Sequence, residues 1–234
     1  MAITNAARAK LIERILDAYD EQREIVKLFL DQLSVVLSNS GSLEPYVHSM
    51  KSRVKDPQHL REKLHRKMAQ CKAKGIAFSI TPDNLLTQVN DLAGVRILHL
   101  YTRQIEMINA ALRGIFDEQK YDVVEGPFAR TWDDESREFF RSCGIETQSS
   151  PTMYTSVHYV IGSASRTTVT CEIQVRTLME EVWGEVDHSI NYPTPTKVLA
   201  STEQLKVLAR VTSSATRLVD SIFRTHETSN GNGD

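Results

Sequence analysis

The stretch TCEIQVRT, residues 170–177, brings three kinds of polar side chain into one row if it forms a strand. Successive side chains of a strand point to opposite faces, so Glu172, Gln174 and Arg176 share one side. The residues between them are apolar and predict the side that faces the core: Cys171, Ile173 and Val175. A carboxylate, an amide and a guanidinium in one row fit either a solvated face or a functional one, and this strand alone leaves both open.

A second carboxylate stands just before another predicted strand. Asp91 precedes the apolar run GVRILHLY, which also carries Arg96. By itself Asp91 could be a turn residue or a helix cap. Together with Glu172 in another strand of the same sheet, it forms a pair of hard oxygen ligands that face the same way. Such carboxylates hold Mg²⁺ when substrate phosphates and water complete the octahedron, so the pair predicts a magnesium site if a phosphate-binding cradle lies beside it.

The segment 51–74 is strongly basic. It carries nine lysines and arginines (51, 53, 55, 61, 63, 66, 67, 72 and 74) against Asp56 and Glu62, a net charge of +7 in a chain whose net charge is −2. A local excess of this size favours a polyanion nearby. A phosphate-rich small molecule and a nucleic acid both fit.

Four cations of this segment have the spacing of a phosphate cradle. Arg53 and Lys55 lie on one side if their segment is extended, and Lys63 and Lys67 are four residues apart on the following predicted helix. Arginine can clamp a phosphate through two donors and lysine acts as a point charge, so together they could surround a triphosphate. A solvated basic helix face has the same pattern and stays open.

The run MYTSVHYVI supplies a further candidate row. Tyr154, Ser156 and His158 share one face of a predicted strand. Tyr154 could stack on a base, and His158 could donate to a phosphate or carry a proton. An aromatic core residue and a satisfied histidine are the structural alternatives. In the helix LMEEVWGEVDHSINY we expect a buried stripe, with Trp183 supporting the strand ahead of it: Leu178, Val182, Val186 and Ile190.

These residues need a mixed α+β fold to position them. Apolar spacing predicts helices at 5–37, 57–72, 104–118, 133–141, 177–191 and 201–225, with Asp56 as N-cap and Pro57 as first residue of the second. Five strand-like runs lie among them: GIAFSI, GVRILHLY, YDVVEG, TSVHYVIG and TVTCEIQVR. Short links between strands indicate a mixed sheet in a single domain. We expect an N-terminal helix at 1–40, a core at 41–195, a C-terminal helix at 196–226 and a polar tail at 227–234.

Composition excludes several protein classes. The chain has 234 residues, 41% hydrophobic and 25% charged, and no apolar run long enough to span a membrane. Its amphipathic start contains acids, which fits neither a secretory signal nor a transit peptide. Three distant cysteines without metal-ligand spacing favour a reducing cytoplasm and argue against a structural zinc site.

Five motifs in this order resemble the synthetase domain of the RelA/SpoT family, which makes the alarmones pppGpp and ppGpp. They are SRVKDPQHLREKL, DLAGVRI, YTSVH, EIQVRT and EVWGEVDHSINY, and they span about residues 45–192. The resemblance implies a nucleotidyltransferase-like fold with a mixed five-stranded sheet flanked by helices. It also implies a reaction: the β,γ-pyrophosphate of ATP moves to the 3′-hydroxyl of GTP or GDP, and AMP leaves.

The resemblance assigns roles residue by residue. It implies that Asp91 and Glu172 bind Mg²⁺ and that Glu172 also helps to activate the acceptor hydroxyl. Two further sets follow from it. The ATP-binding residues would be Arg53, Lys55, Lys63, Lys67 and Arg96, and the acceptor-binding residues would be Tyr154, His158, Gln174 and Arg176. The polar face of TCEIQVRT would then be the wall between two nucleotides.

Two departures from the family pattern bear on the acceptor. His59 stands where the family usually has serine. Met153 stands where the family has a glycine before its tyrosine, at the end of a segment, residues 127–153, that is longer and more acidic than usual. Relatives that use adenine nucleotides, or toxins that pyrophosphorylate the 3′-CCA end of tRNA, therefore stay open, as does an inactive nucleotide-binding module.

The resemblance also bears on organisation. The sequence shows no His-Asp hydrolase motif, and we expect a small enzyme that has only the synthetase domain. The terminal helices could form a homo-oligomer or hold an antitoxin.

Overall fold

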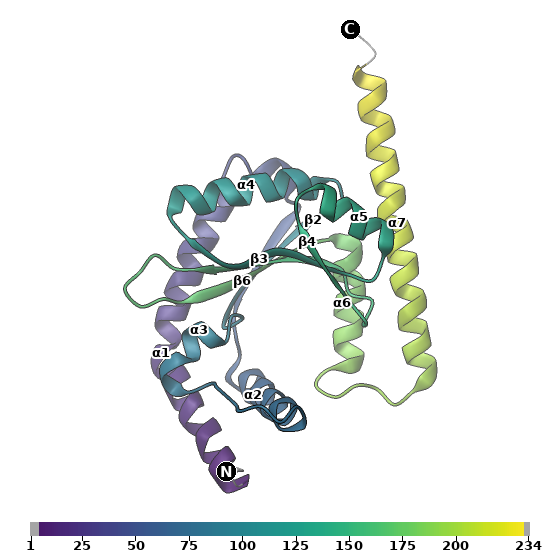
Figure 1. Cartoon of the computed structure of the whole chain (residues 1–234). Helices are drawn as coiled ribbons and strands as arrows, with labels where there is room; N and C mark the ends of the chain where they lie inside the picture. Colours follow the sequence, from purple (N-terminus) through teal and green to yellow (C-terminus); the bar gives the residue numbers. More distant parts are fainter. Residues whose placement is uncertain (1–4, 232–234) are drawn as a thin grey trace.

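The computed structural model describes residues 5–231 and forms a mixed sheet flanked by helices (Figure 1). Its six strands pair in the order β1-β2-β6-β5-β3-β4, with β2–β6 and β3–β4 parallel and the other pairs antiparallel. The strands are β1 (Ser49–Val54), β2 (Ala93–His99), β3 (Asp122–Thr131), β4 (Glu146–Ser149), β5 (Ser156–Gly162) and β6 (Thr170–Thr177). The predicted α+β class is confirmed.

Seven α-helices in the described residues surround this sheet. They are α1 (Asn5–Ser38), α2 (Pro57–Ala73), α3 (Leu85–Gln88), α4 (Gln104–Gln119), α5 (Asp134–Ser142), α6 (Leu178–Asn191) and α7 (Leu199–Gly231). Short 3₁₀ turns lie at Glu44–Tyr46 and Pro82–Asn84. Figure 1 shows α2 and α6 on the opposite side of the sheet from α4, with α7 alongside α6. The sheet therefore has one face toward α1 and α4 and another toward α2 and α6.

The strand prediction was wrong at three places. GIAFSI, residues 75–80, forms no strand, because Gly75 ends α2 at φ +66° and the run then connects to the next turn. Strands β1 and β4 were missed. Both are edge strands whose sequences, SMKSRV and ETQS, lack an alternating apolar pattern, because neither strand buries one full face against the core. The sheet thus has six strands where five were expected.

The six predicted helices are confirmed apart from their ends, and the one-turn helix α3 was missed. Asp56 caps α2 by accepting from the backbone N–H groups of Gln58 and His59, and Pro57 is the first helical residue. The predicted polar tail begins inside α7, which continues to Gly231, and residues 232–234 lie outside the described part. None of the described helices has the length and apolarity that crossing a membrane requires.

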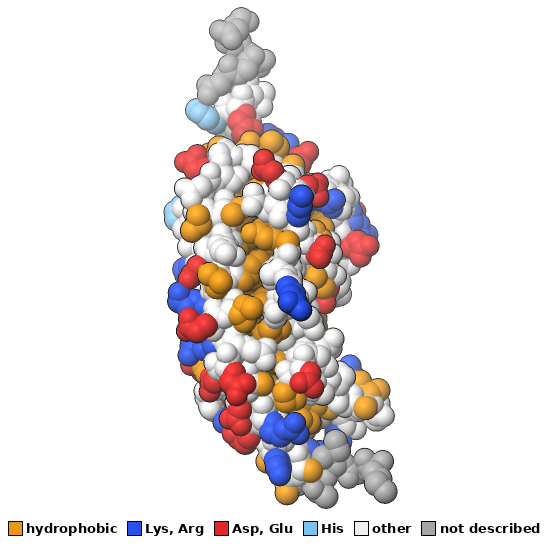
Figure 2. Space-filling model, turned by 90° about the vertical axis from the view of Figure 1, so that its left-hand side faces the viewer, with side chains coloured by type: hydrophobic (Ala, Val, Ile, Leu, Met, Phe, Trp, Pro, Cys, Tyr) orange, Lys and Arg blue, Asp and Glu red, His pale blue; other side chains and the backbone are white. Residues whose placement is uncertain are grey.

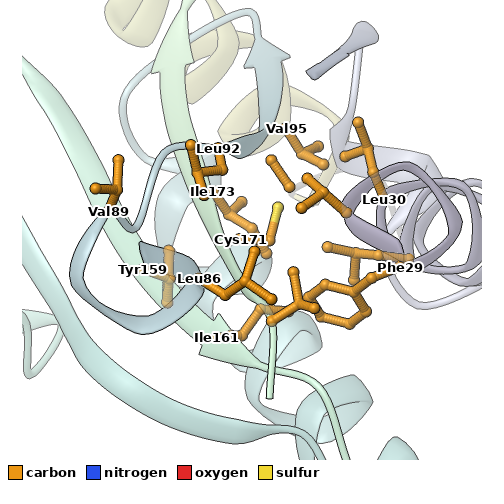
Figure 3. Packing of buried hydrophobic residues seen from close by; sticks show 14 of the residues in the cluster. Phe29, Leu30, Leu86, Val89, Leu92, Val95, Tyr159, Ile161, Cys171 and Ile173 are labelled. Carbon is orange, nitrogen blue, oxygen red and sulfur yellow. The ribbon is translucent and has the colours of Figure 1, made fainter. Parts of the chain in front are cut away.

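The core lies on one face of the sheet and includes the N-terminal helix. As predicted, Cys171, Ile173 and Val175 of β6 are at most 1% exposed. Figure 3 shows Phe29 and Leu30 of α1 pointing into this cluster. The other α1 residues buried in the core are Ile12, Ile15, Leu16, Tyr19, Val26, Leu33 and Leu37.

Helix α1 also holds the segment that carries the basic residues. The Tyr19 hydroxyl donates to the backbone carbonyl of Lys55 at 2.6 Å, and Arg61 of α2 forms a two-pronged ion pair with Glu13. On its outer side α1 exposes Leu28 and Val35. Figure 2 shows that hydrophobic side chains gather along the middle of this side of the molecule, between charged ones.

A glycine lets β3 approach β5 beside one candidate site residue. Gly126 has φ +87°, and a Cβ there would lie 2.4 Å from the backbone carbonyl oxygen of His158. The register between β3 and β5 shifts at this point, which marks an irregularity of the kind that glycine permits.

We predict that Gly126→Ala lowers the free energy of unfolding by about 2 kcal/mol or more, because it adds both a clash and a strained left-handed backbone. Gly114→Ala is the matched control: Gly114 lies in α4 with nothing within 4 Å of its added Cβ, and alanine should stabilise the helix by about 0.5–1 kcal/mol. Urea denaturation of both variants measures this. Equal midpoints for the two would contradict the assigned role of Gly126.

Candidate active site

Strand register collects the predicted polar residues on the face opposite the core. One row runs across five strands as Lys51, Arg96, Gln174, His158 and Phe128, each directly opposite the next. A neighbouring row begins with Arg53 opposite Gly94, which is opposite Glu172. Paired residues on adjacent strands point to the same face, so these side chains share one surface.

Two adjoining cavities open on this surface. The larger, about 600 Å³, lies between β1, β2, β6 and helix α6, and the smaller, about 370 Å³, lies over β3 and β5. Four residues line both cavities, and all four were predicted site residues: Asp91, Tyr154, Glu172 and Gln174. The two carboxylates therefore stand at the junction of the cavities, accessible to a ligand in either.

Asp91 is fixed by two lysines. Lys55 donates to one carboxylate oxygen at 2.8 Å and Lys63 donates to the other at 2.5 Å. Burial would raise the pKa of Asp91, but the two ammonium groups outweigh it and hold the pKa at about 2. Burial lowers the pKa of Lys55, against the opposing effect of Asp91. One anion thus orders two of the predicted phosphate-binding cations.

Glu172 is held by its neighbours on β5 and β6. His158 Nδ1 donates to one carboxylate oxygen and Gln174 Nε2 to the other, both at 3.1 Å. Burial would raise the pKa of Glu172, but these contacts bring it below its usual value, so the carboxylate is ionised at neutral pH. His158 is only 2% exposed and stacks on Phe128, with ring centroids 5.3 Å apart. Its imidazole therefore orients the Glu172 carboxylate from the neighbouring strand β5.

Tyr154 lies at the junction, held by contacts with two predicted partners. Its hydroxyl donates to Gln174 at 3.4 Å, and the Arg176 guanidinium lies over its ring at 5.6 Å from the centroid. Arg176 itself is 4% exposed and fits against α6, where a Cβ on Gly184 would come within 2.6 Å of its guanidinium. The preceding Met153 has φ +60°, a left-handed conformation that glycine adopts without strain.

The predicted buried face of α6 was wrong. Val182, Val186 and Ile190 are 53%, 37% and 38% exposed, while Leu178 is only partly buried. The face toward the sheet instead carries Glu181, because the helix covers charged strand residues and not apolar ones, and the buried Trp183 points to a different side, against Tyr154 and α7. Trp183 is buried as expected and donates to the carbonyl of Leu205 on α7, so it ties α6 to α7, while its support of the preceding strand stays a prediction.

Two glutamates of α6 that the sequence analysis did not identify contact the predicted site residues. Glu181 accepts from Lys51 and Arg96, and Glu185 also accepts from Arg96, at 2.7 Å. Glu181 lies in the first turns of the helix that directly follows β6, and this closeness to the polar strand TCEIQVRT is the sequence signal that could have identified it.

The end of α6 meets α2 across the larger cavity. The Tyr192 hydroxyl donates to Glu62 at 2.5 Å, and its ring stacks on His188 with centroids 4.5 Å apart. His59, which departs from the family pattern, contacts the same ring edge-on at 5.2 Å. These contacts tie the basic helix to the helix that covers the strands.

The predicted nucleotide-binding residues are divided between the two cavities, and two of them line neither. Arg53, Arg96 and Arg176 line the larger cavity, whereas Lys63 and His158 line the smaller one. Neither Lys55 nor Lys67 lines either cavity. Lys55 lies beneath Asp91, with which it forms an ion pair. Burial lowers the pKa of Lys67, and nearby Lys63 adds to this. The residues predicted for ATP thus border both cavities.

The donor set suits a magnesium ion that shares its ligands with a substrate. Asp91 and Glu172 are close enough for the charge of Asp91 to oppose ionisation of Glu172. No group of three or more His, Cys, Asp or Glu that could hold a metal occurs among the described residues. Two carboxylates without a closed cage fit Mg²⁺, which usually takes one or two carboxylates and completes its shell with phosphates and water. The arrangement suits phosphoryl transfer between ligands in adjoining cavities.

Comparison with known proteins agrees with this geometry. Residues 52–197 match a family model described as the region found in RelA / SpoT proteins, and no curated protein sequence matches significantly. Small alarmone synthetase 1 from Bacillus subtilis, bound to its product pppGpp, is similar with a TM-score of 0.62 and 20% identity. That alignment covers 88% of this chain and 98% of the other.

Two further solved structures share the fold. A GTP pyrophosphokinase family protein from Streptococcus pneumoniae has a TM-score of 0.61 at 19% identity, over 92% of this chain and 96% of that one. Small alarmone synthetase 2 from Bacillus subtilis has a TM-score of 0.58 at 20% identity, over 90% and 98%. At these identities the likeness extends to the fold alone.

We predict that Asp91→Asn lowers the free energy of unfolding by about 2 kcal/mol at pH 7, because it removes the partner of Lys55 and Lys63. The depressed pKa of Asp91 makes this stabilisation complete above the unfolded value of 3.8, and it is lost as pH falls toward 2. Denaturation from pH 7 to 3 should show the gap between variant and wild type narrowing below pH 4. Asp117→Asn, an exposed carboxylate on α4, is the control, and a pH-independent gap would contradict the assignment.

We also predict that Met153→Gly raises the free energy of unfolding by about 0.5–1 kcal/mol, because glycine relieves the left-handed backbone strain. Met153→Ala, which shortens the side chain but keeps the Cβ, should show no gain. Thermal melting compares the two. If alanine stabilised the protein as much as glycine does, side-chain packing and not φ would be the cause.

Proposed function

This chain belongs to the RelA/SpoT family, and on that premise we propose that it is an ATP-dependent pyrophosphokinase acting on GTP or GDP. It would transfer the β,γ-pyrophosphate of ATP to the 3′-hydroxyl of the acceptor and so make pppGpp or ppGpp. The bond between the 3′-oxygen and the β-phosphorus forms, the bond between the β-phosphorus and the oxygen bridging to the α-phosphorus breaks, and AMP leaves.

The observation that carries this proposal is the pair of adjoining cavities with Asp91 and Glu172 at their junction. A transfer between two nucleotides needs two sites whose reactive groups meet, and positioning supplies most of the catalysis in such reactions. A module that only bound one nucleotide would need neither the second cavity nor an ionised carboxylate where the cavities meet. This supports the enzyme over the inactive binding module.

Each predicted residue takes a role consistent with its place. Arg53 and Arg96, on adjacent strands, would hold ATP from the larger cavity, while Lys55, Lys63 and Lys67 would direct positive charge toward its phosphates. Arg is suited to two-pronged phosphate or base contacts and Lys to point-charge neutralisation. The lysine cluster would stabilise the charge that develops on the leaving side.

The acceptor would meet the remaining residues. Tyr154 would stack on its base, with Arg176 behind the ring, and Gln174 would line the site between both cavities. Glu172 would accept the proton of the 3′-hydroxyl, since its lowered pKa keeps it ionised and His158 and Gln174 fix its orientation. Mg²⁺ held by Asp91 and Glu172 would neutralise charge on the phosphates.

The electrostatics favour a nucleotide over tRNA as acceptor. Four of the nine cations of the basic segment are paired with acids in the structure, namely Lys51, Lys55, Arg61 and Lys63. The charge available to a long polyanion is therefore smaller than the sequence suggests. Phe128 and Arg130, which line the smaller cavity, lie in the segment that departs from the family pattern and would adapt the acceptor site.

The test offers ATP labelled at the γ-phosphate together with Mg²⁺ and one acceptor at a time: GDP, GTP, ATP or deacylated tRNA. We expect label on GDP or GTP. Label only on ATP or tRNA would contradict the acceptor assignment while keeping the chemistry, and no transfer to any acceptor would favour the binding module.

In the same assay Asp91→Ala and Glu172→Ala should each lower the transfer rate by about 100-fold or more, because each removes a charge at the junction of the cavities. Asp117→Asn on α4 should leave the rate unchanged. Circular dichroism checks that the variants stay folded. Near-wild-type rates in both alanine variants would show that the metal assignment is wrong.

A further inference from the structure

One carboxylate of α6 binds cations from three adjacent strands. Glu181 Oε1 accepts from Lys51 of β1 at 3.1 Å and from Arg96 of β2 at 2.8 Å, and its Oε2 lies 2.5 Å from the Arg176 guanidinium of β6. Lys51 and Arg96 are directly opposite each other in the sheet, and Arg176 follows two residues after the partner of Arg96. Glu181 thus stands over the point where these three side chains converge.

Burial makes this cluster different from a surface ion pair. The Glu181 side chain is 8% exposed, and those of Arg176 and Arg96 are 3% and 23% exposed. Burial would raise the pKa of Glu181, but Arg176 and Arg96 outweigh it, so the carboxylate stays ionised. Buried pairs are screened little by solvent, so the geometry of the arginines depends on this anion.

The two arginines serve different halves of the proposed reaction. Arg96 borders the larger cavity beside Arg53, on the side proposed for ATP. Arg176 lines the same cavity, but it lies over the ring of Tyr154, which also borders the smaller cavity and is proposed to stack on the acceptor base. The Arg176 Nε has no partner of its own among the described residues. Glu181 is therefore the group through which a cation of each nucleotide site is fixed.

Charge balance gives the same carboxylate a second effect. The larger cavity is lined by four cations: Lys51, Arg53, Arg96 and Arg176. Glu181 of α6 forms ion pairs with three of them and so neutralises part of their charge. Without it, the cations would repel one another and attract any polyanion more strongly. Tighter binding of that kind is not specific to the transition state and does not speed the reaction.

We propose that Glu181 is a positioning residue that sets the orientation of Arg96 and Arg176 together and thereby aligns the two nucleotides. This inference rests on the proposed pyrophosphokinase function and deepens it. Glu185 shares only Arg96 and is largely exposed, so it supports the ATP side alone. Neither residue was identified from the sequence.

Glu181→Gln separates positioning from a merely structural role. Loss of the charge should tighten binding of a non-hydrolysable ATP analogue by about threefold to tenfold, an effect that shrinks in high salt. Loss of alignment should lower the single-turnover transfer rate from ATP by about 10-fold to 100-fold. Glu181→Asp, which keeps the charge, should restore part of the rate and the wild-type affinity.

Two comparison variants define the background. Glu203→Gln removes an exposed α7 carboxylate that pairs only with Lys206, and it should change neither affinity nor rate. Glu185→Gln should tighten analogue binding to a smaller extent than Glu181→Gln. If Glu181→Gln matched wild type, or if it and Glu181→Asp lost affinity, rate and melting temperature together, the positioning role would be overturned.

A readout without chemistry keeps this test apart from that of the proposed function. In spectra of protein labelled with ¹⁵N-arginine, the Nε–H groups of Arg96 and Arg176 should be ordered in wild type and mobile in Glu181→Gln. Unchanged spectra would overturn the proposal. If wild type transferred label to no acceptor, the proposed function would fail, while the arginine spectra and analogue binding would still decide the role of Glu181.

Discussion

The parallel pairing of β2 with β6 is the constraint on which the site depends. Its register places Gly94 opposite Glu172 and Arg96 opposite Gln174. Because side chains alternate across a strand, a slip of one residue would send Glu172 into the core and expose Ile173. The apolar face packed under α1 and α4 forbids that slip, so the burial of the core residues fixes the face on which the candidate site lies.

The cleft balances much of its charge internally. Asp91 orders two lysines and Glu181 orders two arginines, so two anions hold four largely buried cations in place, and Glu181 also pairs with Lys51, whose side chain is 60% exposed. Side chains as long as Lys and Arg lose considerable rotamer freedom on ordering, and here the fold has already ordered them. A phosphorylated ligand would exchange one set of ionic partners for another and would not have to organise loose side chains.

The sequence predicted the central elements well and the periphery poorly. Alternation in TCEIQVRT and the apolar runs of β2 and β5 identified the strands whose positions carry the site, because central strands bury one full face. The edge strand β1 has no such face, so the strand that carries Arg53 was expected only as an extended segment. Helix α6 was read by its apolar spacing, which marks its outer side, because its inner side meets charged residues.

The N-terminal helix shows that the limits of a family-matching segment are not the limits of a folding unit. The matched residues 52–197 begin after α1, yet nine α1 side chains, from Ile12 to Leu37, complete the hydrophobic core, and Tyr19 binds the backbone at Lys55. An isolated matched segment would leave that apolar surface facing water. The flanking helix is therefore part of the same folding unit, because its apolar stripe covers the core whose burial holds the candidate site on the other face of the sheet.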